Sequence, residues 1–207
     1  MDLVSNKNVG LGLLTIVLAA SFLLSAPSTS GAPLHPAKDQ AIAVSEEQID
    51  NKPYSVTHVL VHARPEQVWQ VLTDYGTAAT VFPTLQQCQV VTEHGTTKVV
   101  HYRVHPTGCL TNFQYDLEVR ETACKRVDWR RLEGDFKEII GYWKLEPAES
   151  GHATLVTYAS YVNGGLFMPQ PLIKRQSRID LPAIMTALKE HAETLQIASS
   201  GHPHHSD

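Results

Sequence analysis

The sequence predicts an α+β domain in which a seven-stranded antiparallel sheet curves around one long C-terminal helix. Three observations support this prediction: a β-rich run at 54–63, six more strand-like segments between 87 and 162, and an amphipathic pattern from about 171 to 197. The connections between the segments are short, so neighbouring strands should pair antiparallel. A curved sheet that wraps one helix leaves space between them, and we expect the function to lie in that cavity.

The first strand is followed by two short helices. Pro65 suits the first position of a helix, because its missing N–H has no partner there in any case. Val68, Val71 and Leu72 then form an apolar stripe at helical spacing. This helix should close at 74–76, and a second short helix should cover 77–82.

The six later strands are separated by turn residues such as His94-Gly95 and Gly134-Asp135. They are expected at about 87–93, 98–105, 110–121, 125–133, 138–146 and 152–162. Apolar and polar side chains alternate through 113–120, which predicts one buried and one solvent-facing side for that strand.

The C-terminal helix shows apolar residues at spacings of three and four, which predicts one buried face. Pro182 falls inside this pattern and should either kink the helix or split it in two. The residues of the apolar face are Leu172, Ile173, Leu181, Ile184, Met185, Leu188, Ala192 and Leu195.

The N-terminus carries an apolar run at 9–24, whose length suits a signal peptide better than a membrane span of roughly 20 residues. We therefore expect 1–32 to be a cleaved signal peptide or an uncleaved membrane anchor. The domain would be exported, to the periplasm or outside the cell. Residues 33–52 are interpreted as a linker, 53–198 as the folded domain and 199–207 as a disordered tail.

Composition excludes several function classes. Hydrophobic residues make up 43% and charged residues 18% of the chain, which is typical of a globular protein, and the formal net charge is −4. There is no basic footprint for nucleic acid. No serine-hydrolase elbow, phosphate-binding glycine loop, zinc motif or dinucleotide fingerprint occurs, so we expect no cofactor.

The cysteines and histidines leave some alternatives open. Cys88, Cys109 and Cys124 are an odd number for an exported chain, and either a Cys88–Cys109 bridge or three free thiols is compatible with the strand order. The pairs His58/His62 and His101/His105 are each separated by about 13 Å along a strand, too far to bind one ion as a pair. We expect no metal site.

The residues expected to bind a ligand are aromatic and apolar side chains of the later strands, the last loop and the last helix. An alternative is that they only fill the core. They are Phe82, Phe113, Tyr115, Trp129, Phe136, Trp143, Tyr158, Leu166, Met168, Ile184 and Leu188.

The loop 164–169 begins with Gly164-Gly165 and ends at Pro169, with Leu166, Phe167 and Met168 between them. Two glycines permit hinge motion, and exposed apolar residues suit a gate over a pocket or a contact with a membrane. The alternative is a plain connection whose apolar residues pack inward.

Several stretches resemble a known superfamily when taken in order. They are the run 65–75 (PEQVWQVLTDY), Phe82-Pro83, Glu133-Gly-Asp-Phe136, the run 141–147 (GYWKLEP) and Leu181-Pro-Ala-Ile184. Together they resemble the START-like (SRPBCC) superfamily, in particular its polyketide cyclase/dehydrase and coenzyme-Q-binding branch. The resemblance implies the helix-grip fold, with a cavity for lipids, quinones, sterols, hormones or polyketides, and only some members of the superfamily catalyse a reaction.

The sequence supports three hypotheses. The first is a carrier that binds a hydrophobic small molecule or lipid. The second is an aromatase/cyclase or dehydratase, which needs a proton donor and acceptor inside the pocket, drawn from Asp128, Arg103, Arg131, His101 and Tyr158. The third is an interaction module whose cavity has collapsed.

Overall fold

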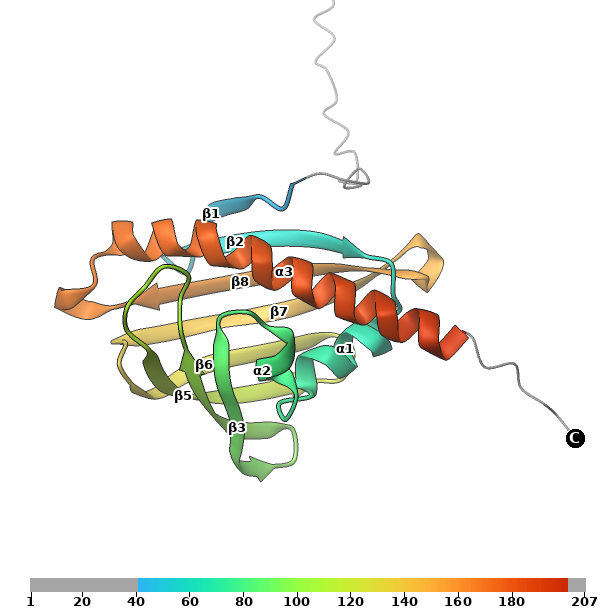
Figure 1. The fold of residues 1–207 in the computed structure, drawn as a ribbon, viewed down its shortest axis with the longest axis horizontal. Helices are drawn as coiled ribbons and strands as arrows, with labels where there is room; N and C mark the ends of the chain where they lie inside the picture. The colour runs from blue at the N-terminus through green and yellow to red at the C-terminus, as the bar shows by residue number, and fades with distance from the viewer. Residues whose placement is uncertain (1–40, 201–207) are drawn as a thin grey trace, which may run out of the picture. The chain divides into compact units, whose positions relative to one another are not determined.

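The computed structural model describes residues 41–200. These residues form one antiparallel sheet of eight strands, in the order β1-β2-β8-β7-β6-β5-β4-β3, and the helix α3 lies across one face of it (Figure 1). The expected signal peptide or anchor at 1–32, the start of the linker and all but the first two residues of the expected tail lie outside the described residues.

The elements follow one another along the chain with short connections. They are β1 (Val44–Ile49), β2 (Lys52–Val61), α1 (Pro65–Thr73), α2 (Ala78–Val81), β3 (Leu85–His94), β4 (Thr97–Val104), β5 (Phe113–Thr122), β6 (Arg126–Gly134), β7 (Glu138–Ala148), η1 (Glu149–Gly151), β8 (Ala153–Asn163), η2 (Gly165–Phe167) and α3 (Gln170–Ser200).

The predicted antiparallel sheet and long C-terminal helix are confirmed, but the sheet has eight strands where seven were expected. The extra strand, β1, lies within the segment interpreted as a linker. It pairs with β2 through the two-residue turn Asp50-Asn51, whose φ angles of 49° and 61° are those of a tight hairpin. This strand was not predicted because Ser45–Gln48 is entirely polar and so lacks the alternation of apolar and polar residues that indicates a strand.

Most strand boundaries differ from the prediction by a few residues, and two points bear on the site. β5 begins at Phe113, three residues after the expected start, because its pairing with β4 begins at the Val104–Phe113 pair, and Leu110 lies fully exposed in the preceding loop. The helix α3 continues through Pro182 and is not split. Within residues 41–200, none of the helices is long and apolar enough to cross a bilayer.

The interior consists of two main clusters of apolar side chains. The first lies between α1, the C-terminal half of α3 and strands β2 and β8, and it includes Val61, Val156 and Leu188, all 0% exposed. The second lies against β4–β7 and is rich in aromatic residues, among them Trp129 and Phe136. The first cluster fixes one half of α3 to the sheet, and the second lies toward the other half.

Candidate ligand site

The inner face of the β2–β8 pair changes character along its length, and this change positions a cavity. Val59 faces Val156, and both are buried beneath the C-terminal half of α3. Further along, Ser55 is paired with Ser160. Because alternate residues of a strand share one face, the inner surface passes from apolar to polar toward the start of α3.

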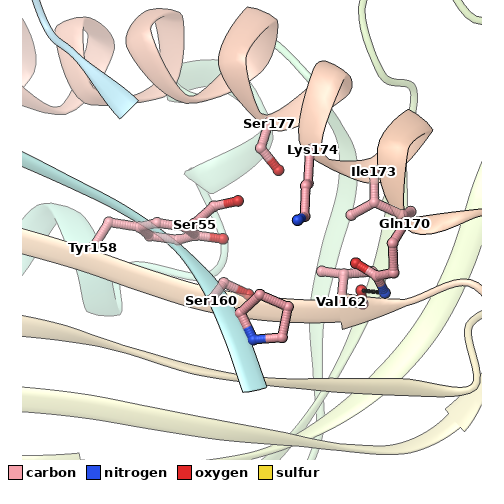
Figure 2. A pocket seen from close by; sticks show the side chains of 9 residues that line it. Ser55, Tyr158, Ser160, Val162, Gln170, Ile173, Lys174 and Ser177 are labelled. Atoms are coloured by element: carbon pink, nitrogen blue, oxygen red, sulfur yellow. Dashed lines mark hydrogen bonds between the residues drawn. The ribbon is translucent and has the colours of Figure 1, made fainter. Parts of the chain in front are cut away.

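A cavity of about 30 Å³ lies at this polar end, between β2, β8 and the first turns of α3 (Figure 2). It has room for a few water molecules but not for a lipid chain. The helix contributes side chains that recur at spacings of three and four and so share one face. The lining residues are Pro53, Ser55, Tyr158, Ser160, Val162, Gln170, Ile173, Lys174 and Ser177.

Six of the nine lining residues carry polar side chains, and none of the nine is acidic. Lys174 Nζ lies 2.6 Å from Oε2 of Glu46 on β1, and Gln170 Nε2 donates to the Val162 carbonyl at 2.8 Å. In the described part of the chain the hydroxyls of Ser55 and Ser177 have no hydrogen-bond partner. The cavity therefore presents hydrogen-bond donors that water or a guest can occupy.

Tyr158 links the polar cavity to the aromatic interior. Its ring meets Trp143 edge-on with a centroid distance of 4.6 Å and lies 5.5 Å from the ring of Trp129. The pKa of Tyr158 is raised above its usual value, because the effect of burial is larger than the opposite effect of the hydrogen bond with Ser160. The phenol is therefore a neutral donor at physiological pH.

The structure brings most of the predicted aromatic residues together in two groups of touching rings. Trp129, Trp143 and Tyr158 form one group. Phe136 joins the second, at 5.2 Å from Phe113 and 5.6 Å from Tyr115. The indole of Trp129 packs over Gly141, where a Cβ atom would lie 2.6 Å from the ring.

The other predicted ligand residues are more dispersed. Phe82 and Leu188 pack in the first cluster, Met168 is half-buried against the second, and Ile184 is half-buried on α3. Leu166 is 95% exposed on η2. Whether these eleven residues contact a ligand stays a prediction.

Burial on the inner face of the β4–β5 pair decreases toward one end. Val100 and Leu117 form the first pair and are buried. The next pair is Tyr102 with Tyr115, whose rings stack at 5.6 Å, and both residues are only half-buried, as is Phe113 beyond them. The apolar inner face is therefore less tightly covered toward the start of α3 than at its other end.

Neither the polar lining of the cavity nor Tyr102 was among the residues predicted from the sequence. Gln170, Ile173, Lys174 and Ser177 share a helical face, and this spacing was available in the sequence. Nothing in the spacing, however, showed that this face lies opposite Ser55 of β2. The cavity lining could not be predicted from the helical spacing alone, because it depends on which strands the helix crosses.

The candidate acid–base residues mostly lie elsewhere. His101 and Asp116 form a 2.6 Å contact between β4 and β5 on the face opposite Val100 and Leu117, and Arg103 lies on that same outer face of β4. Asp128 pairs with Arg126, and Arg131 donates to the Gly134 carbonyl. Of the five candidates, only Tyr158 lines the cavity.

The histidine pairs and cysteines occupy separate places. Strands β8, β7, β6 and β5 lie between the strands that carry His58 and His101. Within the described residues no three His, Cys, Asp or Glu side chains gather at metal-binding distance. The three cysteines are free thiols, and burial raises the pKa of Cys88 to about 12.

A second, larger hollow of about 340 Å³ lies on the outside of the domain, near Arg64, Glu66 and His152. It is open to solvent and is not enclosed between the sheet and α3. The cavity beside Tyr158 is therefore the better candidate for a ligand site.

A family model for polyketide cyclase/dehydrase and lipid transport proteins matches residues 61–189. The chain belongs to this family. The match includes most of the sheet and the first part of α3, and so most of the cavity wall. None of the curated proteins matches the chain.

Solved structures of similar proteins carry the same START-like helix-grip fold. The Zhui aromatase/cyclase from Streptomyces sp. R1128 has a TM-score of 0.63 at 16% identity, covering 72% of this chain and 98% of its own. A START superfamily protein from Mycobacterium smegmatis has a TM-score of 0.61 at 18% identity, and the match covers 69% of this chain and 98% of that protein. A STAR-related lipid transfer protein from Xanthomonas axonopodis has a TM-score of 0.60 at 17% identity, and the match covers 75% of this chain and 96% of that protein. At these identities the likeness shows the fold, and the predicted fold class is confirmed.

Proposed function

We propose that this chain is a carrier that binds a hydrophobic small molecule or lipid between α3 and the sheet. The observation that supports this most is the inner face of β4 and β5, where Tyr102, Tyr115 and Phe113 are half-buried. They pack against the same core cluster as Val162 and Ile173, which line the small polar cavity. An apolar guest would cover this surface, with about 25 cal/mol gained per Å² removed from water. The few polar groups beside Tyr158 would orient the guest.

Loading requires the cavity to enlarge, and the first turns of α3 are the part able to move. They are attached to the rest of the domain by polar contacts: Gln170 to the Val162 carbonyl, Lys174 to Glu46, and Gln176 to the Thr107 carbonyl at 3.1 Å. Exposed polar contacts of this kind contribute little free energy each, so displacement of this segment costs less than unpacking a core.

The loop 164–169 would act as the gate. Gly164 packs against Met168 so closely that a Cβ atom would lie 2.3 Å from the Met168 Cβ. Gly165 has a φ angle of 73°, which favours glycine. Leu166, 95% exposed, would contact a membrane surface when the ligand is taken up or delivered.

The proposed setting is outside the cytoplasm, and the apolar run at 9–24 supports it. Cell fractionation of the full-length chain in its native host, with mass spectrometry of the N-terminus, tests this. A protein found in the cytoplasm with its first residues intact would contradict it.

The second candidate function is an aromatase/cyclase. It is favoured by one observation: both Tyr158 and Lys174 line the cavity, which offers two titratable groups to a substrate. Incubation with a poly-β-ketone substrate analogue separates the two functions, because an enzyme converts it and a carrier returns it unchanged.

The test of the carrier function is native mass spectrometry after gentle purification, followed by thermal unfolding with a panel of lipids and quinones. We expect a co-purified lipid-like mass, or a raised melting temperature with at least one panel member. Ser177→Phe should block the cavity and abolish both signals. Ser199→Phe, an exposed site on the same helix, is the matched control and should keep them. If no lipid-like mass and no stabilisation appear with the unmodified chain, the proposal is wrong.

A further inference from the structure

The cavity beside Tyr158 has an unusual chemical composition for the interior of a hydrophobic carrier. Three serines, a tyrosine, a glutamine and a lysine contribute to its walls, and no aspartate or glutamate does. All six side chains can donate hydrogen bonds, and Lys174 can only donate. Such a wall suits a guest group that accepts hydrogen bonds and carries negative charge.

Among the described residues, two of these donors have no hydrogen-bond partner, and a third forms only a partly exposed ion pair. The Ser55 and Ser177 hydroxyls have no partner within the described residues. Lys174 is paired with Glu46, but both side chains are more than one-third exposed, at 36% and 38%. Exposed ion pairs of this kind contribute little to stability, so another carboxylate can replace Glu46 at low cost.

The apolar wall of the cavity leads into the interior. Val162 and Ile173 line the cavity and also pack against the second core cluster, against which Phe113 and Tyr115 pack as well. A guest with a polar head at Lys174 would therefore extend its apolar tail along these two residues, toward the half-buried aromatic rings.

We propose that this cavity is the head-group subsite for a monocarboxylate with an apolar tail, whose carboxylate replaces Glu46 as the partner of Lys174. This inference rests on the proposed carrier function and names its ligand class. The volume of about 30 Å³ suits a carboxylate better than a larger phosphate group. Ser55 and Ser177 would donate to its oxygens, and Tyr158 would lie at the junction between head and tail (Figure 2).

The test compares the dissociation constants of hexadecanoic acid and hexadecanol, measured by displacement of the neutral dye Nile red from the full chain. The parent should bind the acid about tenfold more tightly than the alcohol, because hydrogen bonds to a charged group are the stronger ones. Lys174→Met should remove most of this preference, and Lys174→Arg should restore part of it. Arg175→Met, an exposed cation on the adjacent helix position, is the matched control and should keep the preference.

Glu46→Gln provides a test with the opposite sign. Removal of the competing carboxylate should tighten the binding of hexadecanoic acid several-fold and leave that of hexadecanol unchanged. A purely structural role of Lys174 would not produce this gain. Melting temperatures of all variants check that the fold is intact.

The outcomes separate this inference from the proposed function. If neither compound nor the dye binds, the carrier function and the subsite are both wrong. If acid and alcohol bind equally, or if Lys174→Met keeps the preference, the chain is a carrier without this subsite. If dodecyl phosphate competes better than dodecanoic acid, the assignment to a carboxylate is wrong.

Discussion

The two halves of α3 lie against the same sheet in different ways. In the C-terminal half, Leu181, Met185, Leu188 and Ala192 recur at spacings of three and four and are all at most 5% exposed. In the N-terminal half, Leu172 is 54% exposed and the attachments are mainly polar. One half holds the fold together, and the other is the half that the proposed carrier function requires to move.

The difference originates in the strands beneath the helix. The C-terminal half covers Val59, Val61 and Val156, so closing this interface removes apolar surface from water. The N-terminal half lies over Ser55 and Ser160, where close packing would bury hydroxyl groups. This interface is therefore the less stable of the two, and segments that open for ligands are drawn from the less stable parts of a fold.

Pro182 marks the boundary between the halves. It has no N–H to donate to the Arg178 carbonyl, and its ring crowds that carbonyl. The helix therefore lacks one bond at the point where its packing changes, and the proposed opening of the cavity would use this point as its hinge.

The largest expected effect comes from truncation of the buried half. Leu188→Ala should lower the free energy of unfolding by about 2–5 kcal/mol, because Leu188 is 0% exposed and its removal leaves a cavity. Leu172→Ala on the other half should change it by less than about 0.5 kcal/mol. Urea unfolding measures both, and equal effects would contradict the division of the helix.

The next effect concerns the attachment of the first half. Asp180 is 8% exposed and accepts hydrogen bonds from the Thr107 N–H at 3.1 Å and from Gln176 Nε2 at 2.8 Å. Asp180→Ala leaves the Thr107 N–H without a partner and should cost about 1–3 kcal/mol in unfolding free energy. It should also speed the binding of Nile red in stopped-flow measurements. Slower or unchanged binding would mean that this contact does not restrain the opening.

Replacement of the hinge residue should have a smaller effect of opposite sign. Pro182→Ala restores the missing helical bond and should raise the free energy of unfolding by about 1 kcal/mol while it slows the release of Nile red. The control is Pro171→Ala in the first turn of the same helix, where a proline costs little. If the variant is stabilised but releases Nile red at an unchanged rate, Pro182 is not a hinge.

The last effect is absent at neutral pH and appears only at alkaline pH, and it concerns the second core cluster, against which Cys88 packs. Burial raises the pKa of the Cys88 thiol from 9.0 to about 12. The folded state therefore holds this proton more tightly than the unfolded chain, so its stabilisation is complete below about pH 9 and is lost as the pH rises toward about 12. Burial also raises the pKa of Tyr115, which adds to the same trend at higher pH.

Urea unfolding at a series of pH values measures this loss. Cys88→Ala should show a shallower decrease of stability above pH 9 than the parent chain, because it lacks one of the raised groups. An equal or steeper slope would mean that the thiol is less enclosed than its place in the interior indicates.

The general architecture could be predicted from the sequence because local patterns determine it. The alternation in 113–120, the turn residues and the apolar spacing on the last helix each predict an element without knowledge of its neighbours. The strand β1 was missed since Ser45–Gln48 is polar, although the Asp50-Asn51 pair signals a hairpin turn.

The candidate site could be predicted only in part. Aromatic residues are easily named as ligand contacts, and Tyr158 does line the cavity. Serines such as Ser55 and Ser177 are common on surfaces, and only the crossing of α3 over β2 and β8 brings these two together. Which face of a helix covers which strand depends on long-range packing, and no local pattern contains that information.

The most direct measurement is photo-crosslinking of the full chain with a fatty acid that carries a diazirine near the end of its tail, followed by peptide mapping. We expect adducts on the half-buried inner-face residues Tyr102, Phe113 and Tyr115, and none on the head-group residues Lys174 and Ser177. Adducts only on the outer face of the sheet, or none that unlabelled fatty acid can compete away, would contradict a guest held beneath the first half of α3.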